Sequence, residues 1–273
     1  MANTPHRPIK AYDNPDFLKS REARPLRILA EYTEPETRFE RFGIKDTIVF
    51  FGSARIAPRD IAEKGLAVAR ETGTGIPAAE RALAMSRYYE EARELSHRLT
   101  EWSKGLGDEA GGRRFVVCSG GGPGIMEAAN RGASEARGLN IGLNIALPFE
   151  QHENPYITHH LAFNFHYFFM RKLWFMYLAK AIVIFPGGFG TIDELFEVAT
   201  LMQTGKVKKP MKLVLYGASY WSEVLNFDAL IKYGTIDPDD LKLFAMVDDV
   251  DTAYNTIVSH LSGRAIEEPG SKL

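Results

Sequence analysis

Short apolar runs alternate with longer amphipathic stretches along most of the chain. The apolar runs predict strands at Thr47–Phe51, Phe115–Cys118, Asn140–Leu147, Leu161–Phe165, Ala181–Phe185 and Met211–Tyr216. The stretches between them predict helices within Ile61–Ser103 (interrupted at 72–77), after Gly124, over Tyr167–Lys180, from Thr191, over Tyr220–Tyr233 and over Asp251–Leu261. Strands that alternate with helices predict an α/β fold, a Rossmann-like doubly wound parallel sheet with helices on both faces.

The ends of the chain differ from this central part. The first 45 residues are polar and rich in proline, and Asn14-Pro15 is typical of a helix cap followed by a first-turn proline. We therefore predict an N-terminal extension over residues 1–45 with one or two short helices. Residues 46–265 are predicted to form the main, Rossmann-like domain, and residues 266–273 a loose tail.

Composition narrows the possible partners. The 273 residues include 33 Lys and Arg against 35 Asp and Glu, a formal net charge of −2, so no basic excess favours nucleic acid or an anionic membrane. Cys118 is the single cysteine, which excludes an intrachain disulfide. No signal peptide is evident in Met1–Lys10, and charged residues interrupt the apolar stretch Leu161–Phe185. We expect a soluble protein of the reducing cytoplasm.

Three predicted strands end in turns of small residues, namely Gly52-Ser53, Ser119–Gly124 and Pro186–Thr191. In a parallel sheet these turns meet at one edge, where glycines and helix N-termini favour an anion. Tight strand-to-helix turns alone would also explain each glycine, but three such turns together favour a phosphate or nucleotide site. The sequence lacks a Walker loop and a complete dinucleotide fingerprint, so a mononucleotide fits better than an NTP or NAD.

The string Pro186-Gly-Gly-Phe-Gly-Thr-Ile-Asp-Glu194 is the most specific feature. Its glycines can form an anion nest, Thr191 can begin a helix, and Glu194 then falls in the first helical turn. Thr191-x-x-Glu194 also fits a capping box, so a structural role and a ligand role both stay open. Arg171 lies within an apolar predicted helix and needs a partner, which a ligand phosphate or Glu194 could supply.

On these residues the chain resembles the Lonely Guy family of nucleoside 5′-monophosphate phosphoribohydrolases, long described as possible lysine decarboxylases. The family marker Pro-Gly-Gly-x-Gly-Thr-x-x-Glu matches Pro186–Glu194 without a mismatch, and Arg171-Lys172 matches the preceding Arg-Lys pair. Ser119–Glu127 and Gly52-Ser53 resemble the family's other ligand loops. The resemblance covers roughly residues 45–265. A first strand–helix unit that extends from Ser53 to Ser119 departs from the shorter members.

The resemblance implies that Arg171 and Glu194 are a catalytic pair that releases a free base and ribose 5-phosphate from AMP or a cytokinin nucleotide. It leaves open whether Arg171 orients the phosphate or Glu194. The implied substrate-binding residues are Gly52, Ser53, Gly120, Gly121, Gly122, Met126, Lys172, Gly187, Gly188, Gly190, Thr191 and Thr200.

The resemblance implies no cofactor and no metal, and members of the family form dimers, so a homodimer or higher homo-oligomer is expected. Lysine decarboxylation is disfavoured because no recognisable pyridoxal phosphate motif surrounds a lysine. His152, His159, His160 and His166 cluster in sequence without the spacing of a metal site. A non-hydrolytic nucleotide or molybdenum-cofactor carrier remains the alternative function, because such carriers share similar glycine-rich loops.

Overall fold

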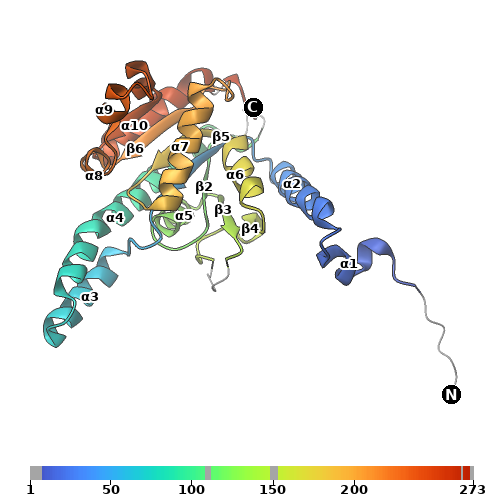
Figure 1. Cartoon of the computed structure of the whole chain (residues 1–273), viewed down its shortest axis with the longest axis horizontal. Coiled ribbons are helices and arrows are strands. Elements are labelled where there is room, and N and C mark those ends of the chain that lie inside the picture. Colours follow the sequence, from blue (N-terminus) through green and yellow to red (C-terminus); the bar gives the residue numbers. More distant parts are fainter. Residues whose placement is uncertain (1–7, 108–111, 148–152, 266, 271–273) are drawn as a thin grey trace.

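A parallel sheet runs through the centre of the molecule (Figure 1). The computed structural model describes residues 8–107, 112–147, 153–265 and 267–270. Within these residues seven strands pair in the order β4-β3-β2-β1-β5-β6-β7, all parallel. The strands are β1 Thr47–Phe51, β2 Val116–Ser119, β3 Asn140–Ile145, β4 Ala162–Phe165, β5 Ala179–Ile184, β6 Lys212–Tyr216 and β7 Phe244–Val247. The predicted doubly wound α/β class is confirmed.

Helices cover both faces of the sheet because its strands are apolar on both sides. In β1, Val49 and Phe51 pack into the core under one helical layer, while Ile48 and Phe50 pack under the other. The first layer contains α2 Arg24–Arg41, α6 Phe168–Tyr177, α7 Phe189–Gln203 and α8 Ala218–Val224. The second contains α4 Ile76–Gly105, α5 Ile125–Glu135 and α10 Val250–His260. The remaining α-helices are α1 Pro15–Lys19, α3 Arg59–Thr72 and α9 Phe227–Lys232.

The N-terminal region is more helical than its proline content suggests. The Asn14 side chain accepts hydrogen bonds from the backbone N–H groups of Asp16 and Phe17, so the predicted cap of α1 is confirmed. Helix α2 has 18 residues, with Pro35 inside it, and is longer than the short helices that were predicted. It is fastened to α6 because the indole of Trp174 donates to the carbonyl of Glu31 at 3.0 Å.

Two predicted helices have wrong boundaries, and one strand was not predicted. Helix α6 ends at Tyr177, and the buried Lys180 belongs to β5, where its ammonium donates to the carbonyl of Glu268 at 2.7 Å. The helix predicted over Tyr220–Tyr233 is two helices, and the side chain of Asn226 caps the second. Strand β7 was not predicted, although its residues Phe244–Val247 are all apolar; it lies at the edge of the sheet, where only Val247 is buried.

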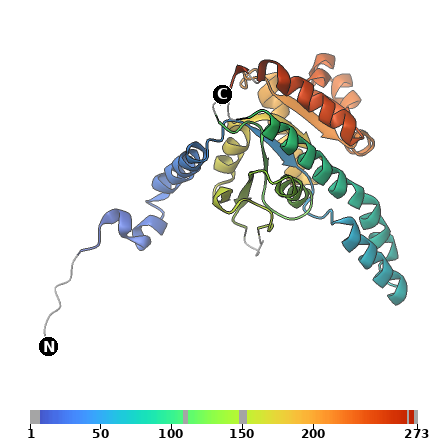
Figure 2. The ribbon, with the colours of Figure 1, turned by 180° about the vertical axis from the view of Figure 1, so that it is seen from behind.

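Helices α3 and α4 form a long hairpin, here called the arm (residues 59–105), that projects from the body of the molecule in both ribbon views (Figures 1 and 2). The predicted interruption at 72–77 is confirmed: Gly73 and Gly75 adopt φ of +68° and +74°, the left-handed region that favours glycine. The C-terminal part of α4 packs closely on α5, where a Cβ added to Gly132 would lie 2.0 Å from the carbonyl oxygen of Arg93.

Among the described residues, no helix is both long enough and apolar enough to cross a bilayer.

The close approach of Gly132 to the carbonyl oxygen of Arg93 predicts that Gly132→Ala destabilises the fold. The added methyl has no space at the α4–α5 contact, so we expect the free energy of unfolding to fall by about 1–3 kcal/mol. Urea unfolding measures it. Gly65→Ala is the matched control: Gly65 is an exposed helical glycine of α3 with no atom near its added Cβ. Alanine there should raise stability by up to about 1 kcal/mol. Equal stability of Gly132→Ala and the wild type would contradict the contact.

Candidate functional site

Three strand-to-helix loops meet where the strand order reverses, between β1 and β5. The N–H of Ser53, after β1, donates to the carbonyl of Pro186, after β5, at 3.0 Å. The carbonyl of Ser53 accepts from the N–H of Ile125, at the start of α5, at 3.1 Å. The backbone of Ser53 therefore ties the three glycine-rich loops together, at the position where ligands bind in open α/β sheets.

The glycines of these loops fall into two groups. Gly124 has φ of +71°, and an added Cβ would lie 2.3 Å from the carbonyl oxygen of Ser53, so this glycine permits the loops to approach. Gly188 and Gly190 have no protein atom within 4 Å of an added Cβ. Both line a cavity of about 1120 Å³ at this edge of the sheet. They border open space that a ligand can occupy.

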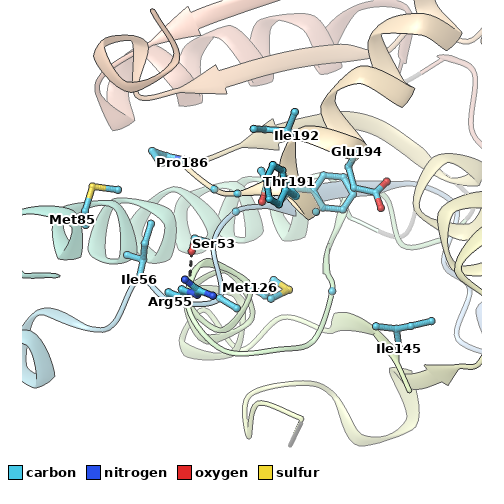
Figure 3. A pocket seen from close by; sticks show the side chains of 18 of the residues that line it. Ser53, Arg55, Ile56, Met85, Met126, Ile145, Pro186, Thr191, Ile192 and Glu194 are labelled. Carbon is cyan, nitrogen blue, oxygen red and sulfur yellow. Dashed lines mark hydrogen bonds between the residues drawn. The ribbon is translucent and has the colours of Figure 1, made fainter. Parts of the chain in front are cut away.

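Figure 3 shows how the labelled side chains of the cavity wall are spread. Met85, Ile56 and Arg55 lie toward one end, Glu194 lies toward the other, and Thr191 lies between them. Ile145 also lies on the Glu194 side. The arm thus borders one end of the cavity, and the sheet edge with α7 borders the other.

Buried amides hold the loop after β2. The Asn130 amide donates to the carbonyl of Ile141, and its oxygen accepts from the hydroxyl of Ser119 at 2.6 Å and from the amide of Asn154 at 2.9 Å. Asn154 also donates to the carbonyl of Gly122 at 3.2 Å. Because each amide is buried and paired, this network fixes the loop's conformation. Asn154 is therefore a support for the loop and is absent from the cavity wall.

Arg171 enters the cavity wall from α6 and is held by backbone carbonyls. Its Nε donates to the carbonyl of Leu143 at 2.7 Å, and its Nη2 donates to the carbonyl of Gly120 at 3.4 Å. A Cβ on Gly120 would lie 2.5 Å from Nη2, so a larger residue there would displace the guanidinium. The sequence predicted a phosphate or Glu194 as the partner of this arginine; within the protein, its hydrogen-bond partners are these carbonyls.

Glu194 is buried in α7, with 6% of its surface exposed, and also lines the cavity. Its Oε2 atom has no hydrogen-bond partner among the described residues. Burial raises the pKa of Glu194 to about 7, and the positive charges of Lys172 and Arg171 oppose that shift. Burial also lowers the pKa of Arg171, with Glu194 opposing the change. The two side chains therefore influence each other electrostatically, although they form no ion pair within 4.0 Å.

The predicted capping box is wrong. Helix α7 begins at Phe189, with Gly188 as its N-cap, so Thr191 is already inside the helix and Glu194 falls in the second turn. No side chain caps this end of the helix. The carboxylate of Glu194 is consequently not engaged in capping, and the N-terminal N–H groups of α7 lie beside the cavity.

Most of the implied ligand residues line the cavity, namely Gly52, Ser53, Gly120, Met126, Arg171, Gly187, Gly188, Gly190, Thr191 and Glu194. Four lie outside it. Gly121 and Gly122 belong to the loop that the amide network supports. The Lys172 ammonium pairs with Asp193 at 2.7 Å and Glu197 at 2.6 Å. Thr200 donates its hydroxyl to the carbonyl of Phe196 within α7.

Sequence reasoning missed several cavity residues. Arg55 follows Gly52-Ser53 directly, so its place in a ligand loop was a usable signal. Arg81 and Met85 come from the arm, far from any recognisable motif. The hydroxyl of Tyr220 donates to the carbonyl of Gly187 at 2.9 Å and so supports the glycine-rich loop of β5. Arg81, Met85 and Tyr220 reach the site only through the tertiary structure.

No group of three or more His, Cys, Asp or Glu side chains that could hold a metal ion occurs within the described ranges. His152 and Glu150 lie outside the described residues.

Comparison with known proteins finds relatives over part of the chain. Residues 126–257 match a family model described as "Possible lysine decarboxylase", a segment that contains Arg171 and the whole Pro186–Glu194 string. A probable cytokinin riboside 5′-monophosphate phosphoribohydrolase of Oryza sativa subsp. japonica, LOG4, is 34% identical over 71 residues. The Arabidopsis thaliana cytokinin riboside 5′-monophosphate phosphoribohydrolases LOG7 and LOG1 are 38% and 39% identical over 60 and 61 residues. Over this segment the chain is similar to the phosphoribohydrolases of the Lonely Guy family.

The matches to these Lonely Guy relatives are partial. They cover 26% of this chain and 31% of LOG4, and 22% of this chain and 28% of LOG7 and LOG1. Similar solved structures include TM1055, with a TM-score of 0.46 and 18% identity over 78% of this chain and 99% of that one. The Moco carrier protein of Chlamydomonas reinhardtii has a TM-score of 0.40 and 18% identity over 80% of this chain and 98% of that one. Neither structure is close enough to inform the site.

Burial of Glu194 predicts a pH-dependent stability. The folded chain keeps the proton of Glu194 up to about pH 7, whereas the ordinary pKa of the side chain is 4.5. The folded state thus binds more protons between these values, and its free energy of unfolding falls as pH rises through them. Glu194→Gln removes this loss, so its stability relative to the wild type should grow by up to about 3 kcal/mol between pH 4 and pH 8.

Urea unfolding across this pH range measures the difference. The control is Glu63→Gln on the arm, because the carboxylate of Glu63 is exposed and pairs with Arg59. It should show no comparable growth. A constant difference between Glu194→Gln and the wild type at all pH values would contradict the raised pKa.

Proposed function

We propose that this protein hydrolyses the N-glycosidic bond of a purine or cytokinin-type nucleoside 5′-monophosphate, releasing the free base and ribose 5-phosphate. The observation that carries the proposal is the carboxylate of Glu194, buried at the cavity with one oxygen that no described protein group satisfies. Such an oxygen is costly to the fold, and a ligand that donates a hydrogen bond to it would supply the missing partner. The names of the plant relatives, all cytokinin riboside 5′-monophosphate phosphoribohydrolases, support the same reaction.

The 5′-phosphate would bind at the N-terminus of α7. Gly188 and Gly190 leave open space there, and the first N–H groups of a helix attract an anion. Thr191 lies on the same wall and adds a hydroxyl. With the phosphate at this position, the ribose would extend toward Glu194, because a second anion at the phosphate itself would repel the carboxylate.

The reaction breaks the bond between C1′ and the base nitrogen, and the electron pair goes to the base. Positive charge develops on the ribose ring, which an ionised Glu194 stabilises. Water adds its oxygen to C1′, Glu194 accepts a proton from that water, and the base nitrogen finally gains a proton. Nucleotide and water thus give base and ribose 5-phosphate without a cofactor.

Arg171 would orient the reacting groups. Two of its nitrogens donate to Leu143 and Gly120, which fixes the guanidinium plane, while its Nη1 forms no hydrogen bond within the described residues. A fixed guanidinium with a free nitrogen suits a ribose hydroxyl or a phosphate oxygen. Its positive charge also favours the ionised form of Glu194.

Loss of the carboxylate should abolish base release. Glu194→Gln keeps the size of the side chain but neither accepts a proton nor offsets the ribose charge, so we expect kcat for AMP to fall by about 10²–10⁴-fold. The matched control is Glu197→Gln, one helical turn further along α7, because Glu197 pairs with Lys172 outside the cavity. Chromatography of free bases from AMP, GMP, CMP, UMP and isopentenyl-adenosine monophosphate measures both variants at pH 8.

Undiminished base release in Glu194→Gln would overturn the proposed role of this residue. If the wild type binds nucleotides but releases no base from any of them, the protein is a nucleotide carrier and not a hydrolase.

The pH profile should follow the ionisation of Glu194. Because the ionised form is the active one, kcat/KM should rise tenfold per pH unit below about pH 7 and level off above it. Steady-state kinetics between pH 5 and pH 9 give this profile. A rate that falls as pH rises through 7 would instead assign the protonated form of Glu194 to the reaction as a general acid.

A further inference from the structure

The cavity extends past the proposed phosphate position, away from Glu194. Its volume of about 1120 Å³ exceeds the roughly 300–1,000 Å³ typical of small-molecule sites. Figure 3 shows Thr191 near the middle, with Glu194 on one side and Arg55, Ile56 and Met85 on the other. A mononucleotide that reaches from Thr191 to the Glu194 end therefore leaves the arm end of the cavity empty.

The arm end carries uncompensated positive charge. Among the described residues that line the cavity, the arginines are Arg55, Arg81 and Arg171, and the single acidic residue is Glu194. Arg171 and Glu194 influence each other at the far end. Arg55 and Arg81 have no acidic neighbour on the cavity wall. The wall is thus electropositive at the arm end, which favours an additional anion there.

The lack of a partner for Arg81 is unusual on the arm. Every other arginine or lysine of α3 and α4 bonds or pairs with a side chain: Arg59 with Glu63, Lys64 with Asp60, Arg70 with Glu80, Arg87 with Tyr88, Arg93 with Glu135, Arg98 with Asp251 and Lys104 with Glu101. Within the described part of the chain, Arg81 forms neither a hydrogen bond nor an ion pair. It is the arginine of the arm that lines the cavity.

Local structure directs Arg55 and Arg81 to the same space. The backbone N–H of Arg55 donates to the hydroxyl of Ser53 at 3.1 Å, which forms a turn directly after the β1 loop. On α4, Ala78, Ala82 and Met85 line the cavity at helical spacing together with Arg81. The two alanines are small, so they leave room beside the guanidinium.

We propose that the arm end of the cavity binds a further phosphoryl group attached to the 5′-phosphate, so that the site accepts nucleoside 5′-diphosphates and triphosphates. This inference rests on the proposed function, because the 5′-phosphate at the N-terminus of α7 sets the direction of the chain of phosphates. The base and ribose lie toward Glu194, the first phosphate lies at Gly188–Thr191, and the next lies between Arg55 and Arg81. Arginine suits this role because its fixed fork of donors matches phosphate oxygens.

Nucleotide binding tests the proposal without turnover. The Glu194→Gln chain is titrated calorimetrically with AMP, ADP and ATP in the absence of divalent cations. We expect ADP to bind about tenfold more tightly than AMP, because one charge-assisted contact has about this effect. Arg55→Ala and Arg81→Ala, combined in that background, should remove the preference for ADP and change the affinity for AMP by less than about threefold.

The matched control is Arg70→Ala, which removes an equal charge from the exposed part of the arm where Arg70 pairs with Glu80, away from the cavity. It should leave the ADP preference intact. Equal affinities for AMP and ADP in the parent chain would overturn the proposal. So would a double variant that weakens AMP and ADP by the same factor, since the arginines would then hold the 5′-phosphate itself.

The result of the binding experiment can be distinguished from the result of the base-release experiment. Base release from AMP together with equal binding of AMP and ADP would overturn this inference and leave the hydrolase proposal standing. A clear ADP preference that depends on Arg55 and Arg81, in a wild-type protein that releases no base, would support the inference and overturn the hydrolase proposal. Absence of binding by all three nucleotides would overturn both.

Discussion

The meeting of three loops at Ser53 is the constraint on which the site depends. Strands β1 and β5 are neighbours whose crossovers leave in opposite directions, which opens a space at their carboxyl ends. The backbone of Ser53 closes the base of that space by bonding to the loops of Pro186 and Ile125. These bonds require a chain without bulk at Gly124, where any side chain would meet the Ser53 carbonyl. Gly124 therefore serves assembly, whereas Gly188 and Gly190 border open space for a ligand.

The loops tied together by Ser53 allow the protein to keep Glu194 at the site, although its burial lowers the free energy of unfolding. Glu194 is buried with an unsatisfied oxygen, and its raised pKa means that the ionised form destabilises the folded state at neutral pH. The surrounding structure offsets this cost through the core packing of Leu195 and Val198 on the same helix. Arg171, fixed by two carbonyls, lowers the cost without neutralising the carboxylate in an ion pair. A closer ion pair would satisfy both groups and leave neither available to a substrate.

Local patterns predicted the elements and loops that repeat in any doubly wound sheet, because apolar runs followed by glycine are directly visible in sequence. These patterns gave wrong predictions where contacts between residues distant in sequence determine the structure. Lys180 was assigned to a helix, since a charged residue at a fully buried strand position is explained by contacts distant in sequence: the carbonyl of Glu268, 88 residues away, and the carboxylate of Asp46 at 3.8 Å. Thr191 resembled an N-cap, yet α7 starts at Phe189, which frees Glu194. Gly187 and Thr191 were visible as a motif, whereas Arg81 reaches the cavity through the geometry of the arm alone.

The arm explains how a common loop arrangement can acquire a different ligand. It is inserted between β1 and β2, so it leaves and rejoins the sheet without altering strand order or the motif Pro186–Glu194. One half of α4 is fixed to α5 by the close approach at Gly132. The other half, with Arg81 and Met85, lines the cavity. Substitutions on this exposed half change the charge and shape of one cavity wall while the core and the carboxylate remain as they are. In the proposals made above, the chemistry and the choice of ligand would thus be carried by separate parts of the fold.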